Sequence, residues 1–368
     1  MISECGDTET QLQEIRARID SIDDEILMLI SQRAEVAKQV AKLKRGLAQD
    51  TSFYRPEREA QILRRIKTKN VGPLDAATVT RLFREIISAC LKLEQSLRIA
   101  FLGPDGTFTQ AAALKHFGHS VTTVPLATIA DVFRDVESGS CNYGVVPIEN
   151  STEGVITHTL DMFLRSPLQI CGEVSLRIHQ HLLAAPNTEL GQIKRIYSHP
   201  QSFAQCRDWL NQHTPSQAMR LSLGSNGEAA KLVKDGILGD AAIASEIAAE
   251  LYGLKILAKN IEDEPSNTTR FLVIGVCDSL PSGKDKTSLL MACRNQSGGL
   301  HGLLTPFAQQ GISMTRIESR PSRLNLWEYV FFVDFEGHRN DSKILLAFTE
   351  LQQRASFFKV LGSYPIAG

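Results

Sequence analysis

Positively charged residues interrupt an apolar pattern near the start of the chain. Between Leu12 and Leu43, apolar residues recur at spacings of three and four, the period of a helix that packs lengthwise against another helix. Arg33 takes one position of this apolar stripe, and Lys44 follows about three helical turns later on nearly the same face. A buried guanidinium group is costly unless an anion meets it. The pattern therefore predicts either a site for an anionic ligand or a coiled-coil dimer in which Arg33 only sets the register.

Further charged positions belong to the same predicted helical region. A second helix opens with Arg58-Glu59 just after a proline, and the apolar stripe of the last helix, which includes Cys90, ends on Glu94. A first helix from about residue 10 to residue 44 would be about 50 Å long. The helical region alone cannot cover an apolar stripe of that length, so we expect a second copy of the chain to pack against it.

The spacing of these charges over residues 8–96 resembles that of the all-helical chorismate mutases. The positions that share this resemblance are Arg16, Arg33, Lys44, Arg58, Glu59, Cys90 and Glu94. The resemblance implies that the three arginines bind the carboxylates of chorismate, that Glu59 binds a hydroxyl group and that Cys90 contacts the substrate. It also places Lys44 and Glu94 at the ether oxygen. Arg16 lies about 100° around the helix from Arg33, so the resemblance assigns it to the site of a partner subunit in an intertwined dimer.

The reaction suits such groups, because a pericyclic rearrangement needs a held conformer and preorganised charge rather than a nucleophile. Two positions depart from the family's best-known form, which has glutamine in place of Glu94 and often serine in place of Cys90. An ionised Glu94 would repel the ether oxygen, whereas a protonated carboxyl group can donate a hydrogen bond to it. We therefore expect mutase activity to rise as the pH falls.

The central region alternates short apolar strands with capped helices, from Arg98 to about Val276. This order predicts a mainly parallel, doubly wound α/β fold with ligands at the loops that follow strands. Ser198 and Gln201 have the spacing of a capping box, as do Ser225 and Glu228. The glycines around residues 103–106 do not complete a dinucleotide or phosphate-loop fingerprint, so nucleotide binding is not expected.

Four segments of this region resemble the signatures of the prephenate dehydratases, in the right order. They are Gly103–Phe108, Val146–Ser151, Tyr197–Gln201 and Asn267–Phe271. The resemblance implies two lobes with the active site between them, as in bacterial solute-binding proteins. It makes Thr269, placed just before a predicted strand, the main donor to the leaving hydroxyl group. Arg270 would bind a carboxylate or order the loop.

The resemblance also assigns the remaining residues of the dehydratase site. Contacts to the substrate carboxylates are expected from Thr107, Asn150, Ser151 and Ser198. A threonine hydroxyl is a weak acid, so a proton source nearby would help the departing hydroxide. Glu149 and His199 are the candidates for that role or for supporting it, since an imidazole can release a proton near neutral pH.

After a linker at residues 278–284, the chain shows a βαββαβ order typical of ferredoxin-like folds. Strands are expected at 288–294, 312–319, 327–335 and 357–361, with helices at 298–309 and 343–353. The region resembles the ACT domain, a regulatory module that binds amino acids. Two motifs match those that line phenylalanine sites between paired modules: Gly298-Gly299-Leu300-His301 and Glu318-Ser319-Arg320-Pro321. An inert dimerisation module is the alternative.

The chain as a whole thus divides into an all-helical mutase at 1–96, an α/β two-lobed dehydratase at 97–277 and an α+β, ferredoxin-like ACT module at 285–368. The substrates implied by the resemblance are chorismate and prephenate, with phenylalanine as effector and a homodimer or higher oligomer as the assembly. A dehydratase whose helices only dimerise is a second interpretation. A ligand sensor without enzymatic activity is a third, which Thr269-Arg270-Phe271 disfavours.

Composition excludes several classes of protein. The formal net charge of −1 gives no basic field for nucleic acid or an anionic membrane. No apolar stretch approaches the roughly 20 residues of a membrane helix, and the first residues lack the pattern of a secretory signal. The seven cysteines are scattered without a C-x-x-C pair, which argues against a disulfide framework and for a reducing, cytoplasmic compartment. Neither a metal nor a cofactor is expected.

Overall fold

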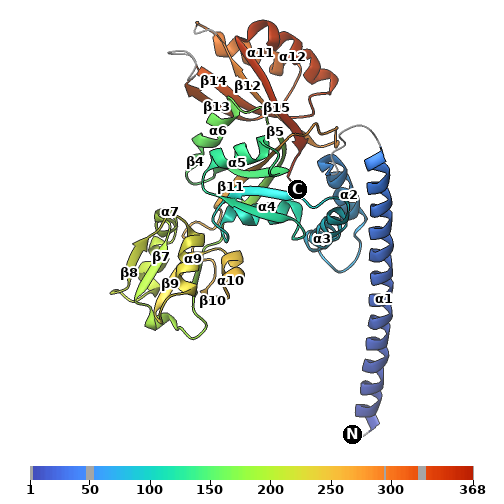
Figure 1. The fold of residues 1–368 in the computed structure, drawn as a ribbon, viewed down its shortest axis with the longest axis vertical. Helices are drawn as coiled ribbons and strands as arrows, with labels where there is room; N and C mark the ends of the chain where they lie inside the picture. The colour runs from blue at the N-terminus through green and yellow to red at the C-terminus, as the bar shows by residue number, and fades with distance from the viewer. Residues whose placement is uncertain (1–2, 47–53, 294–295, 322–328, 368) are drawn as a thin grey trace.

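The computed structural model describes residues 3–46, 54–293, 296–321 and 329–367. Three N-terminal helices flank one lobe of a two-lobed α/β region, and a small sheet with two helices packs on the same lobe from another side (Figure 1). The second α/β lobe lies at the far end of the molecule from this small sheet.

The N-terminal helices are α1 (Ser3–Gly46), α2 (Pro56–Lys69) and α3 (Ala76–Glu94). The first is longer at both ends than the predicted range of 10–44, and Pro56 opens α2 as the sequence indicated. Residues 8–32 of α1 are exposed on every side, and its packing on α3 buries only positions near its C-terminal end, such as Ala41. The apolar stripe predicted from the sequence, including Ile15 at 57% exposure, is therefore left uncovered by the single chain.

The segment that enters α2 joins the helices to the first lobe. Tyr54 is buried beside Phe117 and Tyr143, and its hydroxyl lies 2.9 Å from Nε2 of His116. Burial lowers the pKa of His116 to about 3, so this ring is neutral. His119, just beyond, hydrogen-bonds through Nδ1 to Glu85 of α3 at 2.8 Å.

The first lobe is a six-stranded sheet in the order β2-β1-β3-β11-β5, with a short β4 beside β3. Its strands are β1 (Arg98–Leu102), β2 (Thr122–Leu126), β3 (Tyr143–Asn150), β4 (Gly154–Val155), β5 (Gln169–Arg177) and β11 (Thr268–Gly275). Its helices are α4 (Phe108–Phe117), α5 (Ile129–Glu137) and α6 (Thr157–Phe163). β1 is parallel to β2 and β3, whereas β11 is antiparallel to β3 and β5.

The second lobe is inserted between β5 and β11. Its five-stranded sheet has the order β10-β6-β9-β7-β8, formed by β6 (His181–Ala184), β7 (Arg195–Ser198), β8 (Met219–Ser222), β9 (Asp240–Ala244) and β10 (Lys255–Ala258). Its helices are the 3-10 helix η1 (Leu190–Gln192), α7 (Pro200–Gln205), α8 (Arg207–His213), α9 (Asn226–Lys234) and α10 (Glu246–Tyr252).

Both sheets are mixed rather than mainly parallel, so that expectation was wrong. In the second sheet β7 is parallel to β8 and β9, but β6 is antiparallel to β9 and β10. The first lobe is completed only when the chain returns from the second lobe, and the returning strand β11 runs against β3. Thr269 is also inside this strand rather than just before it.

One of the two capping predictions holds and one does not. The Ser225 side chain accepts a hydrogen bond from the Glu228 N–H and starts α9. Ser198, however, is the last residue of β7, and His199 caps α7 with Pro200 at its first turn. Proline lacks an N–H and has a helical φ, so it suits that first position and shifts the helix start by one residue.

The C-terminal module has the βαββαβ order that the sequence predicts. Its elements are β12 (Asp285–Ala292), α11 (Gly299–Gln309), β13 (Met314–Pro321), β14 (Tyr329–Glu336), α12 (Ser342–Arg354) and β15 (Phe357–Pro365). The antiparallel sheet has the order β13-β14-β12-β15. Residues 294, 327 and 328 of the predicted strands lie outside the described residues.

This sheet shares a core with the first lobe. One face packs under α11 and α12, through residues such as Met291 and Phe335. The other face, with Leu290 and Phe332, belongs to the same apolar cluster as Leu272 of β11. Because side chains alternate along a strand, a sheet with both faces covered reads as continuous apolar runs, as β12 and β14 do.

Cysteine pairing differs from the expectation. Cys171 of β5 and Cys277, just after β11, form a disulfide, whereas Cys90, Cys141 and Cys206 are buried thiols. The two partners are 106 residues apart in sequence, and the antiparallel pairing of their strands brings them together. Among the helices described, none combines the length and apolar character needed to cross a bilayer.

Candidate active sites

Three of the charges predicted for the first site meet where α1 packs on α3. Burial raises the pKa of Glu94, and the charges of Lys44 and Arg33 oppose this rise, so both cations act on the Glu94 carboxyl group. All three side chains are half-buried. Cys90 lies one helical turn before Glu94 and is buried. The seam thus holds two cations and an acid beside one thiol.

A fourth predicted residue, Glu59, is held by a partner that sequence reasoning missed. Arg84 of α3 lies 3.5 Å from it, between Nε and Oε1. Burial raises the pKa of Glu59 to about 7, although the Arg84 charge and hydrogen bond act in the opposite direction. Glu59 therefore titrates near neutral pH. Arg84 lies beside the apolar stripe of α3. A cation at the edge of an apolar stripe was the pattern from which the sequence could have predicted this partner of Glu59.

Arg16 and Arg58 do not join these residues within one chain. Arg16 is exposed and lies about 25 Å along the α1 axis from Arg33, at 1.5 Å per residue. Arg58 is exposed on α2. The role of Arg16 in the site of another subunit therefore stays a prediction.

The second cluster forms where β3 pairs with β11. Asn150 stands directly opposite Thr269, and its Nδ2 donates a 2.8 Å hydrogen bond to Thr269 Oγ1. Its Oδ1 accepts from the backbone N–H groups of Thr152 at 3.0 Å and Glu153 at 3.1 Å. Since a backbone N–H can only donate, these bonds determine which way the Asn150 amide points. Thr269 Oγ1 consequently serves Asn150 as an acceptor, and its own hydrogen is left for another partner.

Asn267, within the fourth signature, completes this cluster and was not singled out from the sequence. It is 2% exposed, and its Oδ1 accepts from Asn150 Nδ2 at 2.8 Å. Its Nδ2 has no hydrogen-bond partner among the described residues. Ser151 ties the same loop to β11, because its Oγ accepts from the Thr268 N–H at 2.9 Å.

Glu149 and Arg270 do not belong to this cluster, which disfavours direct roles at Thr269 but leaves the expected alternatives, a supporting Glu149 and a loop-ordering Arg270, as predictions. Side chains alternate along a strand, so these two residues face away from Asn150 and Thr269. Glu149 pairs with Arg316 of β13 at 3.2 Å. Arg270 pairs with Glu173 at 2.8 Å and with Asp334 at 2.6 Å. Neither side chain is placed to release a proton to the leaving group or to bind a substrate carboxylate beside Thr269.

The second lobe contributes the segment around His199. Ser198 is fully buried, and its Oγ lies 3.0 Å from Asn226 Oδ1 and 3.1 Å from the Ile243 carbonyl. Its hydroxyl group is thus engaged inside the lobe, which disfavours the predicted contact to a substrate carboxylate. His199 is half-buried and accepts the Gln201 N–H at Nδ1, 3.2 Å away. A neutral His199 therefore carries its proton on Nε2.

The loop from Gly103 to Thr107 belongs to the first lobe and contacts the second. Thr107 caps α4, and the Ser245 hydroxyl of the second lobe donates to the Gly106 carbonyl at 2.9 Å. The Tyr252 hydroxyl donates to the Asp105 carbonyl at 3.2 Å. Gly227 permits this close approach, because a Cβ there would lie 2.4 Å from the Asp105 oxygen.

The two motifs expected to bind an effector lie on different parts of the C-terminal module. Gly298 caps α11 with a left-handed φ of 76°, and Gly299, Leu300 and His301 form its first turn, with Leu300 and His301 exposed. In the second motif, Ser319 and Pro321 are exposed, but Glu318 and Arg320 are half-buried on the alternate face of β13. Arg320 pairs with Asp161 of α6 at 3.2 Å. This motif therefore touches the first lobe directly.

Three family models match successive parts of the chain. The model for chorismate mutase type II matches residues 15–95, the model for prephenate dehydratase matches residues 99–278, and the model for the ACT domain matches residues 287–352. Within the described residues, no group of three or more His, Cys, Asp or Glu side chains is arranged to hold a metal ion.

Similar proteins and structures extend over most of the chain. A bifunctional chorismate mutase/prephenate dehydratase of Stutzerimonas stutzeri is 55% identical over 97% of this chain and 98% of its own length. A protein of the same name from Pseudomonas aeruginosa is 54% identical over 98% of this chain and 99% of its own. The crystal structure of a prephenate dehydratase from Arthrobacter aurescens in complex with L-Phe is 34% identical, with a TM-score of 0.67. It covers 73% of this chain and 90% of that one.

Proposed function

The chain belongs to the family of bifunctional chorismate mutase/prephenate dehydratases, and from that premise we propose how its residues perform the two reactions and sense the end product. It converts chorismate to prephenate and prephenate to phenylpyruvate, on the route to L-phenylalanine. It is therefore both an isomerase and a lyase. The match of the mutase model to residues 15–95 disfavours the alternative in which the helices only dimerise.

The mutase reaction would take place at the seam between α1 and α3. Arg33 supplies a cation for a carboxylate of chorismate, while Lys44 and a protonated Glu94 donate hydrogen bonds to the ether oxygen as the C–O bond breaks. Glu59 binds a substrate hydroxyl, Cys90 lines the site beside Glu94, and Arg58 adds a further cation. The raised pKa of Glu94 supports its role as a donor. Arg16 would complete the site of a second subunit.

The dehydratase reaction would begin at Thr269. In prephenate, the bond to the ring carboxylate breaks and releases carbon dioxide, its electron pair moves into the ring, and the C–O bond to the 4-hydroxyl breaks. The observation on which this proposal depends is the orientation of Asn150, which makes Thr269 Oγ1 an acceptor on one side. The Thr269 hydrogen is then free to stabilise the departing hydroxide.

The other groups of the dehydratase site would come from both lobes. His199 would contribute from the second lobe as a hydrogen-bond donor through Nε2, and in its protonated imidazolium form it would supply the proton that turns the hydroxide into water. Thr107 and Ser151 remain candidates for substrate carboxylates, with Asn150 between Ser151 and Thr269. A substrate bound between the lobes would contact both of them. The loop at Gly103–Thr107 already contacts the second lobe.

Feedback inhibition by phenylalanine would act through the C-terminal module. The Arthrobacter aurescens structure was determined with L-Phe, and the ACT model matches residues 287–352 here. We assign the effector site to the two motifs at Gly298–His301 and Glu318–Pro321. Inhibition requires that phenylalanine bind one conformation of the chain more tightly than another.

The assembly and compartment follow from other features. The exposed apolar stripe of α1 calls for a second copy of the chain, so we assign a homodimer or a higher homo-oligomer. Biosynthetic relatives of this kind favour a cytoplasmic location. A reducing cytoplasm would hold Cys171 and Cys277 as neighbouring thiols rather than as the disulfide.

One experiment tests the whole proposal. Purified protein is supplied with chorismate, and prephenate and phenylpyruvate are followed over time with and without L-phenylalanine. Both products should form in sequence, and phenylalanine should slow the second step. The Thr269→Ala variant should accumulate prephenate while consuming chorismate at the rate of the unaltered protein. Phenylpyruvate formation by that variant at the full rate would refute the assignment of Thr269.

A further inference from the structure

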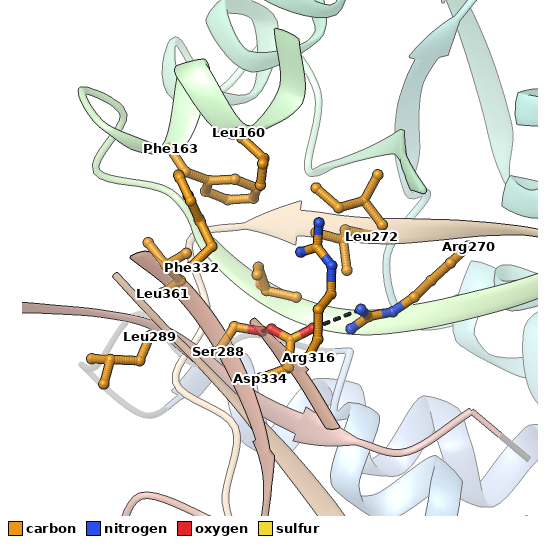
Figure 2. A pocket seen from close by; sticks show the side chains of 12 residues that line it. Leu160, Phe163, Arg270, Leu272, Ser288, Leu289, Arg316, Phe332, Asp334 and Leu361 are labelled. Carbon is orange, nitrogen blue, oxygen red and sulfur yellow. Dashed lines mark hydrogen bonds and ion pairs between the residues drawn. The ribbon is translucent and has the colours of Figure 1, made fainter. Parts of the chain in front are cut away.

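Strand β11 presents Thr269 on one face and Arg270 on the other, and the Arg270 face meets the C-terminal module. The Arg270 guanidinium group is bound on three sides. Nε lies 2.8 Å from Glu173 Oε2, Nη1 lies 2.6 Å from Asp334 Oδ2, and Nη2 lies 3.1 Å from the Tyr364 hydroxyl. Figure 2 shows Arg270 reaching toward Asp334 from the first lobe.

The partners of Arg270 are themselves fastened to the C-terminal sheet. Asp334 Oδ1 accepts a 2.6 Å hydrogen bond from Ser288 Oγ, which also lies 2.7 Å from the Tyr364 hydroxyl. Glu173 lies in the first lobe, but both its oxygens are 2.9 Å from Lys286 Nζ of β12. Asp334 and Glu173 side chains are 7% and 3% exposed. Buried carboxylates need such partners, so the loss of one member would destabilise the whole network.

An apolar wall surrounds this network. The small cavity beside it is lined by side chains of both modules, among them Leu160, Leu272, Phe332 and Leu361 (Figure 2). In such surroundings a charge-assisted hydrogen bond is stronger than in water, and an unpaired charge is more costly. The contact between Arg270 and Asp334 therefore strongly restrains the position of β11 against the C-terminal sheet.

We propose that Arg270 is a positioning residue for the dehydration, which ties β11 to the C-terminal sheet through Asp334 and Tyr364 and so keeps Thr269 aligned with Asn150. The proposal rests on the assigned role of Thr269 in the proposed function. The Arg270 side chain has its donors engaged away from Thr269, so it acts through the backbone that the two residues share. A displacement of about 1 Å at a reacting group can lower a rate by about 100-fold.

The test is to weaken the contact in the full-length protein from the regulatory side. Asp334→Asn keeps the shape and the acceptor for Ser288 but loses the charge that faces Arg270. We expect the dehydratase kcat to fall at least about tenfold while KM for prephenate changes less than about threefold. The reason is that the loss of an interaction made in the transition state lowers kcat. Tyr364→Phe, which removes one hydroxyl group, should give a smaller fall in kcat of the same kind.

Three comparisons separate positioning from general damage. Mutase turnover of each variant should stay at the level of the unaltered protein, which shows that the chain is folded. Lys359→Gln removes another contact between the same modules, in which Nζ donates to the carbonyls of Phe163 at 2.9 Å and Ser166 at 2.6 Å. That variant should retain dehydratase kcat within about twofold, because its contact does not involve β11. Arg270→Gln combined with Asp334→Asn should be no worse than the poorer single variant, as for two groups that act as a unit.

Several results would overturn the proposal. Unchanged kcat in both Asp334→Asn and Tyr364→Phe would show that the contact does not position Thr269. A rise in KM at constant kcat would show that Arg270 binds prephenate directly. An equal loss of dehydratase kcat in Lys359→Gln would show that the variants only disturb the packing of the C-terminal module on the first lobe. A loss of mutase turnover in both Asp334→Asn and Tyr364→Phe would show that they disturb folding. Failure of the unaltered protein to convert prephenate would instead refute the proposed function.

Discussion

The acid at the end of α3 determines how the first reaction responds to pH. Burial raises the pKa of Glu94, so its protonated form, the only form that can donate to the ether oxygen, grows as the pH falls through a higher range than for an ordinary glutamate. Mutase kcat/KM should therefore rise toward acidic pH. Glu94→Gln donates at every pH and should flatten this dependence.

The measurement is a pH–rate profile of chorismate consumption for both proteins. Dehydratase turnover on added prephenate, measured over the same range, serves as the control, because Glu94 lies outside that site. A profile that keeps its slope in Glu94→Gln would move the titration to another group. Glu59, whose pKa is raised to about 7, would be the first to examine.

Asn150 should be as important for the second reaction as Thr269 itself. Asn150→Asp replaces the Nδ2 donor with a carboxylate oxygen, which would attract the Thr269 hydrogen that the leaving group needs. Loss of one such donor typically lowers kcat by about 100-fold or more. We expect that loss in prephenate turnover, with mutase turnover unchanged.

A matched variant is available next to it. Thr152→Val removes a hydroxyl group near Asn150 Oδ1 but keeps the backbone N–H that orients the amide. Its dehydratase kcat should fall less than about tenfold. Equal losses in the two variants would mean that the Asn150 amide is not the group that orients Thr269.

The sequence predicted which residues belong to the sites better than it predicted where their side chains point. Asn150 and Thr269 were recognisable from their signatures, and so was the association of Arg33 and Lys44 with Glu94. Glu149 and Arg270 sit in the same signatures, yet the alternation of a strand turns them to the opposite face. Period-two counting along residues 146–150 would have revealed this for Glu149. The burial of Ser198, by contrast, depends on Asn226 and Ile243, which no local pattern connects to it.

Among the elements, α1 depends most on a partner. Ile15 and Ile22 are exposed in the single chain at 57% and 47%, so changing them leaves its own fold intact. An aspartate at both positions would bury two charges in the helix contact between subunits, which is strongly unfavourable. We expect the Ile15→Asp/Ile22→Asp protein to dissociate at micromolar concentration and to lose mutase activity, because Arg16 would leave the neighbouring site.

Light scattering gives the mass, and chorismate consumption gives the activity. Ala17→Asp is the matched control, since residue 17 is also exposed but points about 180° away from the stripe. That variant should keep the assembly and the activity. Dissociation without loss of mutase turnover would contradict the sharing of Arg16 between subunits.

Local patterns predicted the elements better than their pairing. The helices of the N-terminal region and the βαββαβ order follow from the spacing of apolar residues, which is a property of neighbouring positions. The antiparallel direction of β11 does not, because it results from where the chain re-enters the first lobe after residue 267. Likewise, Cys171 and Cys277 meet only because β5 and β11 pair.

For the molecule as a whole, Arg320 connects the proposed effector site with the first lobe. Arg320→Ala and Glu318→Ala remove groups assigned to phenylalanine binding, and each should raise the half-inhibitory phenylalanine concentration about tenfold or more, a coupling of ordinary size. Asp161→Asn removes the anion that holds Arg320 against α6. It should free Arg320 for the effector and lower that concentration.

Inhibition curves of prephenate turnover, with phenylalanine binding measured by calorimetry, distinguish these outcomes. The opposite signs at Arg320 and Asp161 are the decisive feature. Should Asp161→Asn also weaken inhibition, the pair would be part of the inhibited state rather than a competitor of the effector. Equal inhibition in Glu318→Ala would count against the effector site, and would favour a module that only dimerises.

The way the second lobe is attached has a consequence for how such a protein could be built and rebuilt. The chain leaves the first lobe after β5 and comes back at β11, and the Ile178 N–H donates to the Asn267 carbonyl at 2.9 Å, so the exit and the return lie side by side. The second lobe is therefore an inserted domain that is joined to the first lobe by two adjacent segments of the chain. A gene segment encoding it can be lengthened, exchanged or removed without rerouting the remaining polypeptide, which leaves substrate choice on that side open to change while Thr269 stays in its strand.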